Sequence, residues 1–238
     1  ERLIPYLKDL FVSGSFKYST LESALKNLEV VLKDNPEEAE ALLFKSLMEM
    51  MTADDDSLKK VMTLRPDWSL PYFLLGRFQK LRGEIAEAEK WFRLTLEKNP
   101  DHPRALAELA EVAFLDRKYE SAEELLSQAL ALDNEMPRAH LISGFINREK
   151  GNYDEALADF RTITSLRPDH EEGTYHQALI LIELARWPEA LDSLNSLIKL
   201  AGSYEMFGYA LRGLSYLMLD KLVEAEADCR QALTINPD

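Results

Sequence analysis

The sequence contains little cysteine and no long hydrophobic run, and each absence excludes a class of protein. A single cysteine, Cys229, among 238 residues excludes an internal disulfide framework and a zinc site built from several thiolates. No apolar stretch approaches the roughly 18 residues that a membrane-spanning helix needs. With 46% hydrophobic and 29% charged residues, the composition is typical of a soluble folded protein.

Positive charge is also scarce. The chain has 28 basic residues against 42 acidic ones, for a net charge of -14. Such a surface repels phosphate backbones and anionic lipid, so we expect no nucleic-acid partner. The sequence does not specify a compartment: we favour the cytoplasm, with a periplasmic or membrane-tethered full-length protein as alternatives. Because the chain opens on Glu1 rather than Met, we expect it to be a segment of a longer protein.

The sequence does have an internal period of 34 residues. In the most regular part of the repeat, each copy has an aromatic or aliphatic residue, then an alanine three positions later, then a bulky apolar residue four positions after the alanine. The four copies are GEIAEAEKWF (83–92), RKYESAEELL (117–126), GNYDEALADF (151–160) and ARWPEALDSL (185–194). The acids are not repeated, since Asp154 is matched by Ala86 and Pro188. We therefore interpret the acids as solvent-facing residues and the repeated feature as packing.

Helix ends and starts recur with the same period. Prolines, which disfavour helix in the residue before them, mark the expected ends. These are Pro36, Pro66, Pro100, Pro168 and Pro237. Candidate N-caps follow the ends or take their place, namely Asp67, Asp101, Asp133 and Asp169. Between these signals the apolar spacing is helical and is broken once by a short turn, so each repeat is predicted to be two helices.

This pattern resembles the tetratricopeptide repeat. The third repeat carries the family's residues as Tyr72, Leu75, Gly76, Ile85, Ala88, Phe92 and Pro100. The fifth carries Gly144, Tyr153, Ala156, Phe160 and Pro168. Small residues at two of these places let the helices of a pair approach closely, while large ones fill the space around the contact.

The resemblance implies an all-α fold, a right-handed superhelix (α-solenoid) of about seven tandem repeats, with the first helix of each repeat lining a concave groove. We expect one domain over residues 1–238, in which the first two repeats are degenerate. The predicted repeats are 5–36, 37–66, 69–102, 103–136, 137–170, 171–204 and 206–238.

No residue pattern predicts catalysis, a metal site or a cofactor. The four histidines include no pair one turn apart on a single helix, and His102 and His170 fall in equivalent loops between repeats. We assign the histidines surface or packing roles. Cys229 falls where other repeats place Phe92 and Phe160, so we predict that it is a buried apolar residue rather than a reactive thiol.

The family resemblance implies a partner-binding groove along the first helices, in which apolar residues are flanked by basic ones. The predicted residues are Phe73, Arg77, Lys80, Arg104, Arg138, Leu141, Phe145, Arg148, Tyr175, His176 and Leu179.

The resulting hypothesis is a non-enzymatic scaffold that binds a peptide or an amphipathic helix of a protein partner. That partner would supply apolar anchors and acidic residues opposite the arginines. One alternative is self-association through terminal repeats, where Leu222 and Val223 would be exposed. Another is the substrate-recruiting arm of a larger enzyme whose catalytic domain lies elsewhere.

Overall fold

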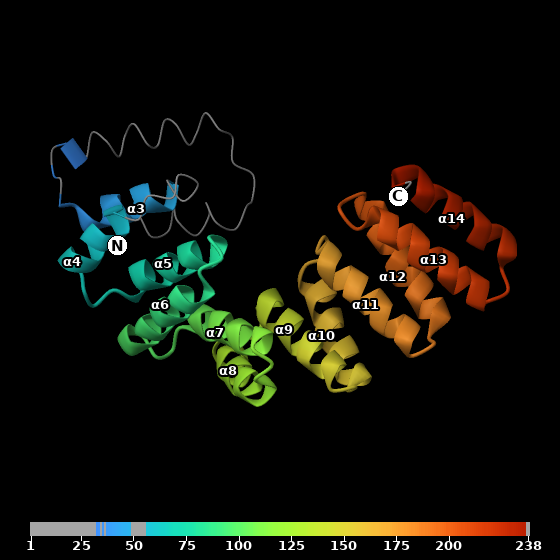
Figure 1. The fold of residues 1–238 in the computed structure, drawn as a ribbon, viewed down its shortest axis with the longest axis horizontal. Helices are drawn as coiled ribbons and strands as arrows, with labels where there is room; N and C mark the ends of the chain where they lie inside the picture. Colours follow the sequence, from blue (N-terminus) through green and yellow to red (C-terminus); the bar gives the residue numbers. More distant parts are fainter. Residues whose placement is uncertain (1–31, 34, 36, 49–55, 237–238) are drawn as a thin grey trace. The chain divides into compact units, whose positions relative to one another are not determined.

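The computed structural model describes residues 32–33, 35, 37–48 and 56–236, and every regular element within these ranges is an α-helix (Figure 1). The first predicted repeat, residues 5–36, lies almost entirely outside them. The chain forms two compact units, Glu1–Leu109 and Ala110–Asp238, whose boundary falls within one helix.

The first unit contains four whole helices and part of a fifth in its described residues. In chain order they are α3 (Ala39–Met48), α4 (Asp56–Leu64), α5 (Ser69–Leu81), α6 (Ile85–Lys98) and the first part of α7 (Pro103–Leu115). Helix α5 packs on α6 and on α4.

The second unit holds the rest of α7 and seven further helices. They are α8 (Tyr119–Leu132), α9 (Pro137–Glu149), α10 (Tyr153–Leu166), α11 (Glu171–Glu183), α12 (Trp187–Leu200), α13 (Glu205–Met218) and α14 (Leu222–Ile235). Helices pack within the pairs α9–α10, α11–α12 and α13–α14, and each of these pairs also contacts the helix before it. The predicted two-helix repeat is therefore confirmed for these segments.

From the pair α5–α6 onward, the turn within each helix pair has one residue in the left-handed region. Gly83 and Gly151 supply it with φ of 81° and 79°, and Arg117, Ala185 and Asp220 adopt it without being glycine, at φ of 55° to 59°. All five occupy the same place in their repeats. A left-handed residue costs a non-glycine side chain roughly 1 kcal/mol or more, so the turn geometry is imposed by the packing of the two helices it joins.

The N-caps differ from the sequence prediction. Asp67, Asp101, Asp133 and Asp169 are not at the N-cap positions of the helices that follow, because each lies two or more residues before the first helical residue. Histidines take this role at two helices: the Nδ1 of His170 accepts from the backbone N–H of Gly173 at 3.0 Å, and the Nδ1 of His102 accepts from that of Ala105 at 3.1 Å.

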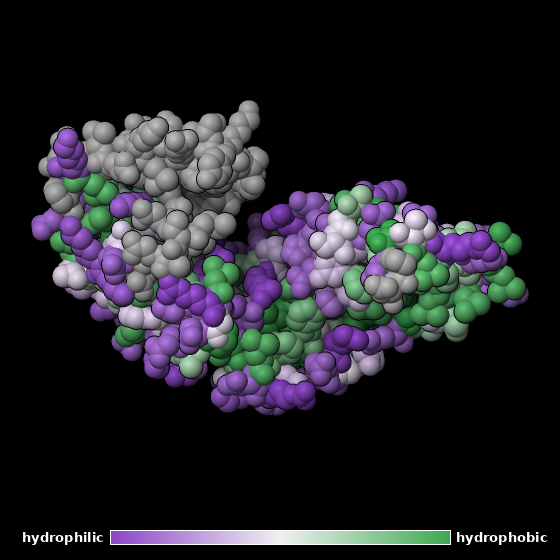
Figure 2. Space-filling model, turned by 45° about the horizontal axis from the view of Figure 1, so that its top comes forward, coloured by the Kyte–Doolittle hydropathy of each residue, from purple (hydrophilic) through white to green (hydrophobic). Residues whose placement is uncertain are grey.

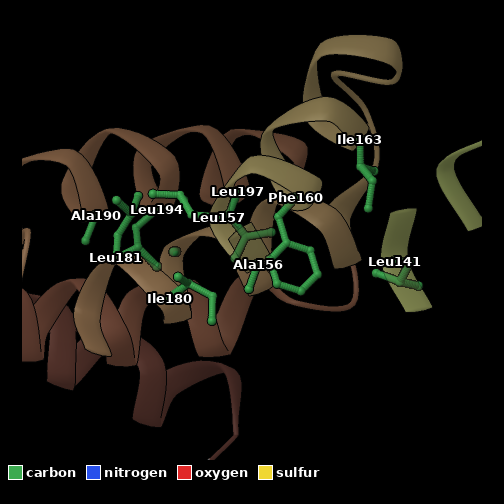
Figure 3. Close-up of a cluster of buried hydrophobic side chains, with 11 residues drawn as sticks. Leu141, Ala156, Leu157, Phe160, Ile163, Ile180, Leu181, Ala190, Leu194 and Leu197 are labelled. Carbon is green, nitrogen blue, oxygen red and sulfur yellow. The ribbon is translucent and has the colours of Figure 1, made fainter. Parts of the chain in front are cut away.

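The core of the second unit alternates small and large side chains. Phe160 is fully buried beside Ala156, Leu157 and Ile163 on α10, and Leu194 and Leu197 of α12 lie in the same cluster (Figure 3). A Cβ added to Gly144 would lie 2.8 Å from Phe160 Cε1, well inside ordinary carbon contact distance. The glycine is therefore what allows α9 and α10 to approach each other closely.

The prediction for Cys229 is wrong, because its side chain is exposed. Its counterparts Phe92, Phe160 and Leu194 are all fully buried. Cys229 lies on α14, the last helix in the described part of the chain, and no further helix covers it there. The repeat pattern gives the correct position of Cys229 on the helix. Whether that side chain is buried depends on a covering helix from the next repeat.

Candidate binding surface

Four of the predicted site residues lie in the first unit. Phe73 is buried, with its ring centroid 5.9 Å from that of Phe92 and 4.8 Å from that of His102. Arg77 and Lys80 both face Glu108 of α7: Lys80 Nζ lies 2.6 Å and Arg77 Nε 3.8 Å from its carboxylate oxygens. Arg104 is exposed.

The other predicted arginines lie in the second unit, where they also pair with carboxylates of neighbouring first helices. Arg138 Nε donates to Glu111 Oε2 at 2.9 Å, which joins α9 to α7. Arg148 donates from Nη2 to Glu183 Oε1 at 2.6 Å, which joins α9 to α11. These charge-assisted bonds fix the register between first helices. A partner's acidic groups would have to compete with carboxylates already in place.

The aromatic residues of the second unit form a continuous series of contacts across three first helices. The ring centroids of Phe145 on α9 and His176 on α11 are 4.7 Å apart, and those of His176 and Tyr175 are 5.0 Å apart. The ring centroid of Tyr175 also lies 4.9 Å from that of Tyr204 and 5.8 Å from that of Phe207 on α13. We call Phe145, Tyr175, His176, Tyr204 and Phe207 the aromatic row.

The aromatic row is only partly buried. Phe207 is 43% exposed, and the other four members have intermediate exposure. Large, stiff rings that keep part of their surface in water are the side chains most enriched at the centres of protein interfaces. Of the other two predicted residues, Leu141 is fully buried, while Leu179 is partly buried one turn along α11 from Tyr175.

His176 is held neutral within the row. Burial, and then the positive charge of Arg148, lower its pKa to about 4. Its Nδ1 is buried and has no hydrogen-bond partner among the described residues. The ring stacks at 5.4 Å on Phe160. At neutral pH this imidazole therefore behaves as another flat ring of the row rather than as a charge or a base.

Tyr204 and Glu183 were not among the predicted site residues. Tyr204 lies between α12 and α13 and joins the row through Tyr175, although a loop position carries no helical periodicity that would indicate this. Glu183 is the last residue of α11 and follows its partner Arg148 by 35 residues, one residue more than the repeat period. That spacing could have suggested the ion pair from the sequence.

A cluster of polar side chains around Asp159 includes a serine and a histidine, residue types that also occur in catalytic sites. Asp159 accepts from Ser143 Oγ at 2.7 Å and from Asn147 Nδ2 at 3.0 Å, and it faces His140 Nδ1 at 3.0 Å. The other ring nitrogen of His140 faces the carbonyl of Asn134, so no base is directed at the serine. This network joins α9 to α10 and provides no activated nucleophile.

Among the described residues, no group of three or more histidine, cysteine, aspartate or glutamate side chains could hold a metal ion. In the same part of the chain, no helix is both long and apolar enough to cross a membrane.

Comparison with known proteins agrees with the helix pairs. The family model for the tetratricopeptide repeat matches residues 82–137 and 147–205. Protein CTR9 homolog of Arabidopsis thaliana is 28% identical over 159 residues, which are 64% of this chain and 14% of that protein. The chain thus spans only a small part of this curated relative.

Solved structures resemble the chain in fold. YrrB, described as a tetratricopeptide-repeat protein with an unusual peptide-binding site, has a TM-score of 0.65 at 16% identity, covering 78% of this chain and 95% of YrrB. PilF of Pseudomonas aeruginosa has a TM-score of 0.72 at 16% identity, covering 84% of this chain and 92% of PilF. At these identities the likeness establishes the fold alone. The chain therefore contains tetratricopeptide repeats and has the all-α solenoid fold of that family, whose members are generally scaffolds for protein interactions.

Proposed function

We propose that the second unit is a peptide-binding module in which the aromatic row receives a segment of a protein partner. The observation that carries this proposal is the row itself, whose partly exposed rings run without interruption from Phe145 on α9 to Phe207 on α13. Isolated exposed apolar residues are ordinary on protein surfaces, but a contiguous aromatic strip is typical of an interface.

The partner's chemistry follows from what already surrounds the row. Arg138 and Arg148 are paired with Glu111 and Glu183, so the main attraction available to a guest is apolar contact with the rings. We therefore expect a short extended or helical segment with two or more aromatic or aliphatic anchors. The charge pairs at the edge would set its direction rather than its affinity. Affinity in the micromolar range, about -8 kcal/mol, is ordinary for such a module.

This scaffold function is supported by the family, and YrrB supplies a relative in fold that is described as having a peptide-binding site. In this chain the binding of a peptide is our proposal. Helix α9 contributes Phe145, α11 contributes Tyr175 and His176, and α13 contributes Phe207, so a guest would lie across three repeats.

The test begins by selecting peptides from a random displayed library against the whole chain and measuring their dissociation constants by fluorescence anisotropy. We expect selected peptides to be rich in apolar residues and to bind Tyr175→Ser and Phe207→Ser at least tenfold more weakly. The matched control is Leu132→Ser, which removes an equally exposed apolar side chain of α8 outside the row. Equal affinity for the wild type and for both row variants, with all proteins folded by circular dichroism, would refute the proposal.

A further inference from the structure

Three rings at one end of the aromatic row contact one another and form a triangle. The ring centroids of Tyr175 and Tyr204 are 4.9 Å apart, those of Tyr175 and Phe207 are 5.8 Å apart, and those of Tyr204 and Phe207 are 6.2 Å apart. We call these three residues the ring trio. All three keep part of their surface in water. A cation above the middle of a triangle of this size can lie within about 6 Å of all three centroids, the range in which an aromatic ring attracts it.

The exposure of Phe207 belongs to the row rather than to the end of the sequence. The equivalent residue of α9 is Arg138, and each of the two lies one residue before a small, buried residue of its helix. Arg138 stays exposed although α10, α11 and α12 follow it, and it bonds back to α7. Phe207 likewise contacts rings that precede it in the chain, those of Tyr175 and Tyr204. A helix that followed α14 in the same register would therefore leave the ring trio open.

Two carboxylates stand beside the ring trio. Glu171 and Glu172 are the first residues of α11, four and three positions before Tyr175. A Cβ added to Gly202 would overlap the carboxylate of Glu171, which therefore lies against the loop that carries Tyr204. Burial, and then the negative charge of Glu172, raise the pKa of the Tyr204 hydroxyl above its ordinary value. Acidic and aromatic groups thus adjoin at this end of the row, and Figure 2 shows hydrophobic and strongly hydrophilic residues side by side over the C-terminal helices.

These two carboxylates differ from others along the first helices, because no basic side chain neutralises them. Glu111 and Glu183 are both paired with arginines of α9. Neither Glu171 nor Glu172 forms an ion pair with any described residue. In the same part of the chain, no lysine or arginine lies over a ring of the trio. Unneutralised negative charge next to aromatic rings favours a cationic group of the guest at this place.

The second unit already holds one arginine in such a setting. Arg212 Cζ lies 5.4 Å from the ring centroid of Tyr209 and 5.9 Å from that of Tyr216. Its Nε and Nη2 each donate to a carboxylate oxygen of Asp228 at 2.7 Å. Two tyrosine rings and one carboxylate are therefore enough to hold a guanidinium in this fold, and the ring trio offers three rings and two carboxylates.

We propose that the ring trio, together with Glu171 and Glu172, binds the guanidinium of an arginine in the peptide guest. This inference rests on the proposed function, because it names the residue of the guest that meets one end of the aromatic row. A guanidinium stacks on aromatic faces and also donates hydrogen bonds to carboxylates, whereas a quaternary ammonium has no hydrogen to donate. The apolar anchors of the guest would then lie toward Phe145, and the arginine would fix the direction in which the guest binds.

The probe is N-acetyl-arginine methylamide, titrated into the whole chain while the ring-proton chemical shifts of the ring trio are followed by NMR. Its matched control is the citrulline analogue, which has nearly the same shape and no charge. A third compound, the Nε-trimethyllysine analogue, carries the same charge as arginine without a hydrogen-bond donor on its cationic group.

We expect the arginine probe to bind about fivefold more tightly than either analogue, with the largest shifts at the ring trio. Glu172→Gln and Tyr204→Leu should each weaken its binding about threefold. The control variant is Glu155→Gln, which removes the charge of an exposed acid on α10 and should leave the affinity unchanged.

Equal affinity for the arginine and citrulline compounds would overturn the inference, as would tighter binding of trimethyllysine. Equal losses in Glu155→Gln and Glu172→Gln would also overturn it, because they would indicate attraction to the net charge of the chain alone. A chain that binds library-selected peptides across the aromatic row, yet shows no preference for arginine, would contradict this inference and leave the proposed function standing. Arginine binding at the ring trio of a chain that selects no peptide would instead contradict the proposed function, and with it the peptide as the source of the arginine.

Discussion

Substitution of Gly144 by alanine tests the physical basis of the repeat. The new Cβ would lie 2.8 Å from Cε1 and Cζ of Phe160, where carbon atoms prefer about 3.5–4.0 Å. Phe160 cannot move away easily, because it is fully buried and its ring packs against those of Phe145 and His176 at 5.9 Å and 5.4 Å. Overpacking of this kind costs about 1–3 kcal/mol.

The substitution also has a stabilising effect, which must be subtracted from the overpacking cost. Alanine is better than glycine in a helix interior by about 1 kcal/mol. We therefore expect Gly144→Ala to lower the free energy of unfolding by about 1 kcal/mol net, measured by urea denaturation. Combining it with Phe160→Leu, which removes the ring atoms in conflict, should give less destabilisation than the sum of the single changes, with a coupling of about 1 kcal/mol.

Gly213→Ala is the matched control for this experiment. Its new Cβ would lie 3.2 Å from Cys229 Sγ, 3.3 Å from Ala225 O and 3.4 Å from Asp228 Cβ, all longer than the 2.8 Å contacts at Gly144, and the side chain of Cys229 is exposed and can shift. Helix propensity should then prevail, leaving the protein unchanged or about 0.5 kcal/mol more stable. The packing argument is refuted if Gly144→Ala is as stable as the wild type, or if the two glycine variants behave alike.

Three further outcomes follow from the charged groups of the second unit. The hydrogen bond to Asp159 raises the pKa of His140 above its unfolded value of about 6.5. The stability that protonated His140 contributes through Asp159 is complete below that pH and is lost as the pH rises through the folded pKa. The difference in urea midpoint between the wild type and His140→Gln should therefore shrink from about pH 5.5 to about pH 8.5. A constant difference contradicts this reasoning. Arg212→Met leaves the buried Asp228 without its paired guanidinium and should destabilise by about 3 kcal/mol, largely recovered by adding Asp228→Leu; a loss below about 1 kcal/mol contradicts this. An NMR titration should give His176 a pKa of about 4, and a transition above pH 6 would contradict its burial among the rings.

The helix pairs could be predicted from the sequence because small and large residues recur with a fixed period. Ala88, Ala122, Ala156 and Ala190 are all fully buried, as their positions in the repeat indicate. These residues pack within their own helix pair, so the information that determines their burial lies within a single repeat.

The errors fall where the next repeat, or the loop between repeats, decides the outcome. Cys229 has the register of a core residue but lacks a covering helix among the described residues. The aspartates after the helix ends are good caps by composition, yet His170 is the residue at the cap position of α11. The ion pair of Arg148 with Glu183 has a spacing close to the repeat period, whereas that of Arg138 with Glu111, 27 residues apart, depends on side-chain geometry that spacing does not give.

The most direct test of the proposed function is to locate a bound peptide on the protein. Isotope-labelled chain is titrated with a library-selected peptide, and the amide chemical shifts are followed by NMR. We predict that the largest changes cluster at Phe145, Tyr175 and Phe207 on α9, α11 and α13. Changes confined to the second helices α10 and α12, with the aromatic row unaffected, would contradict the proposal.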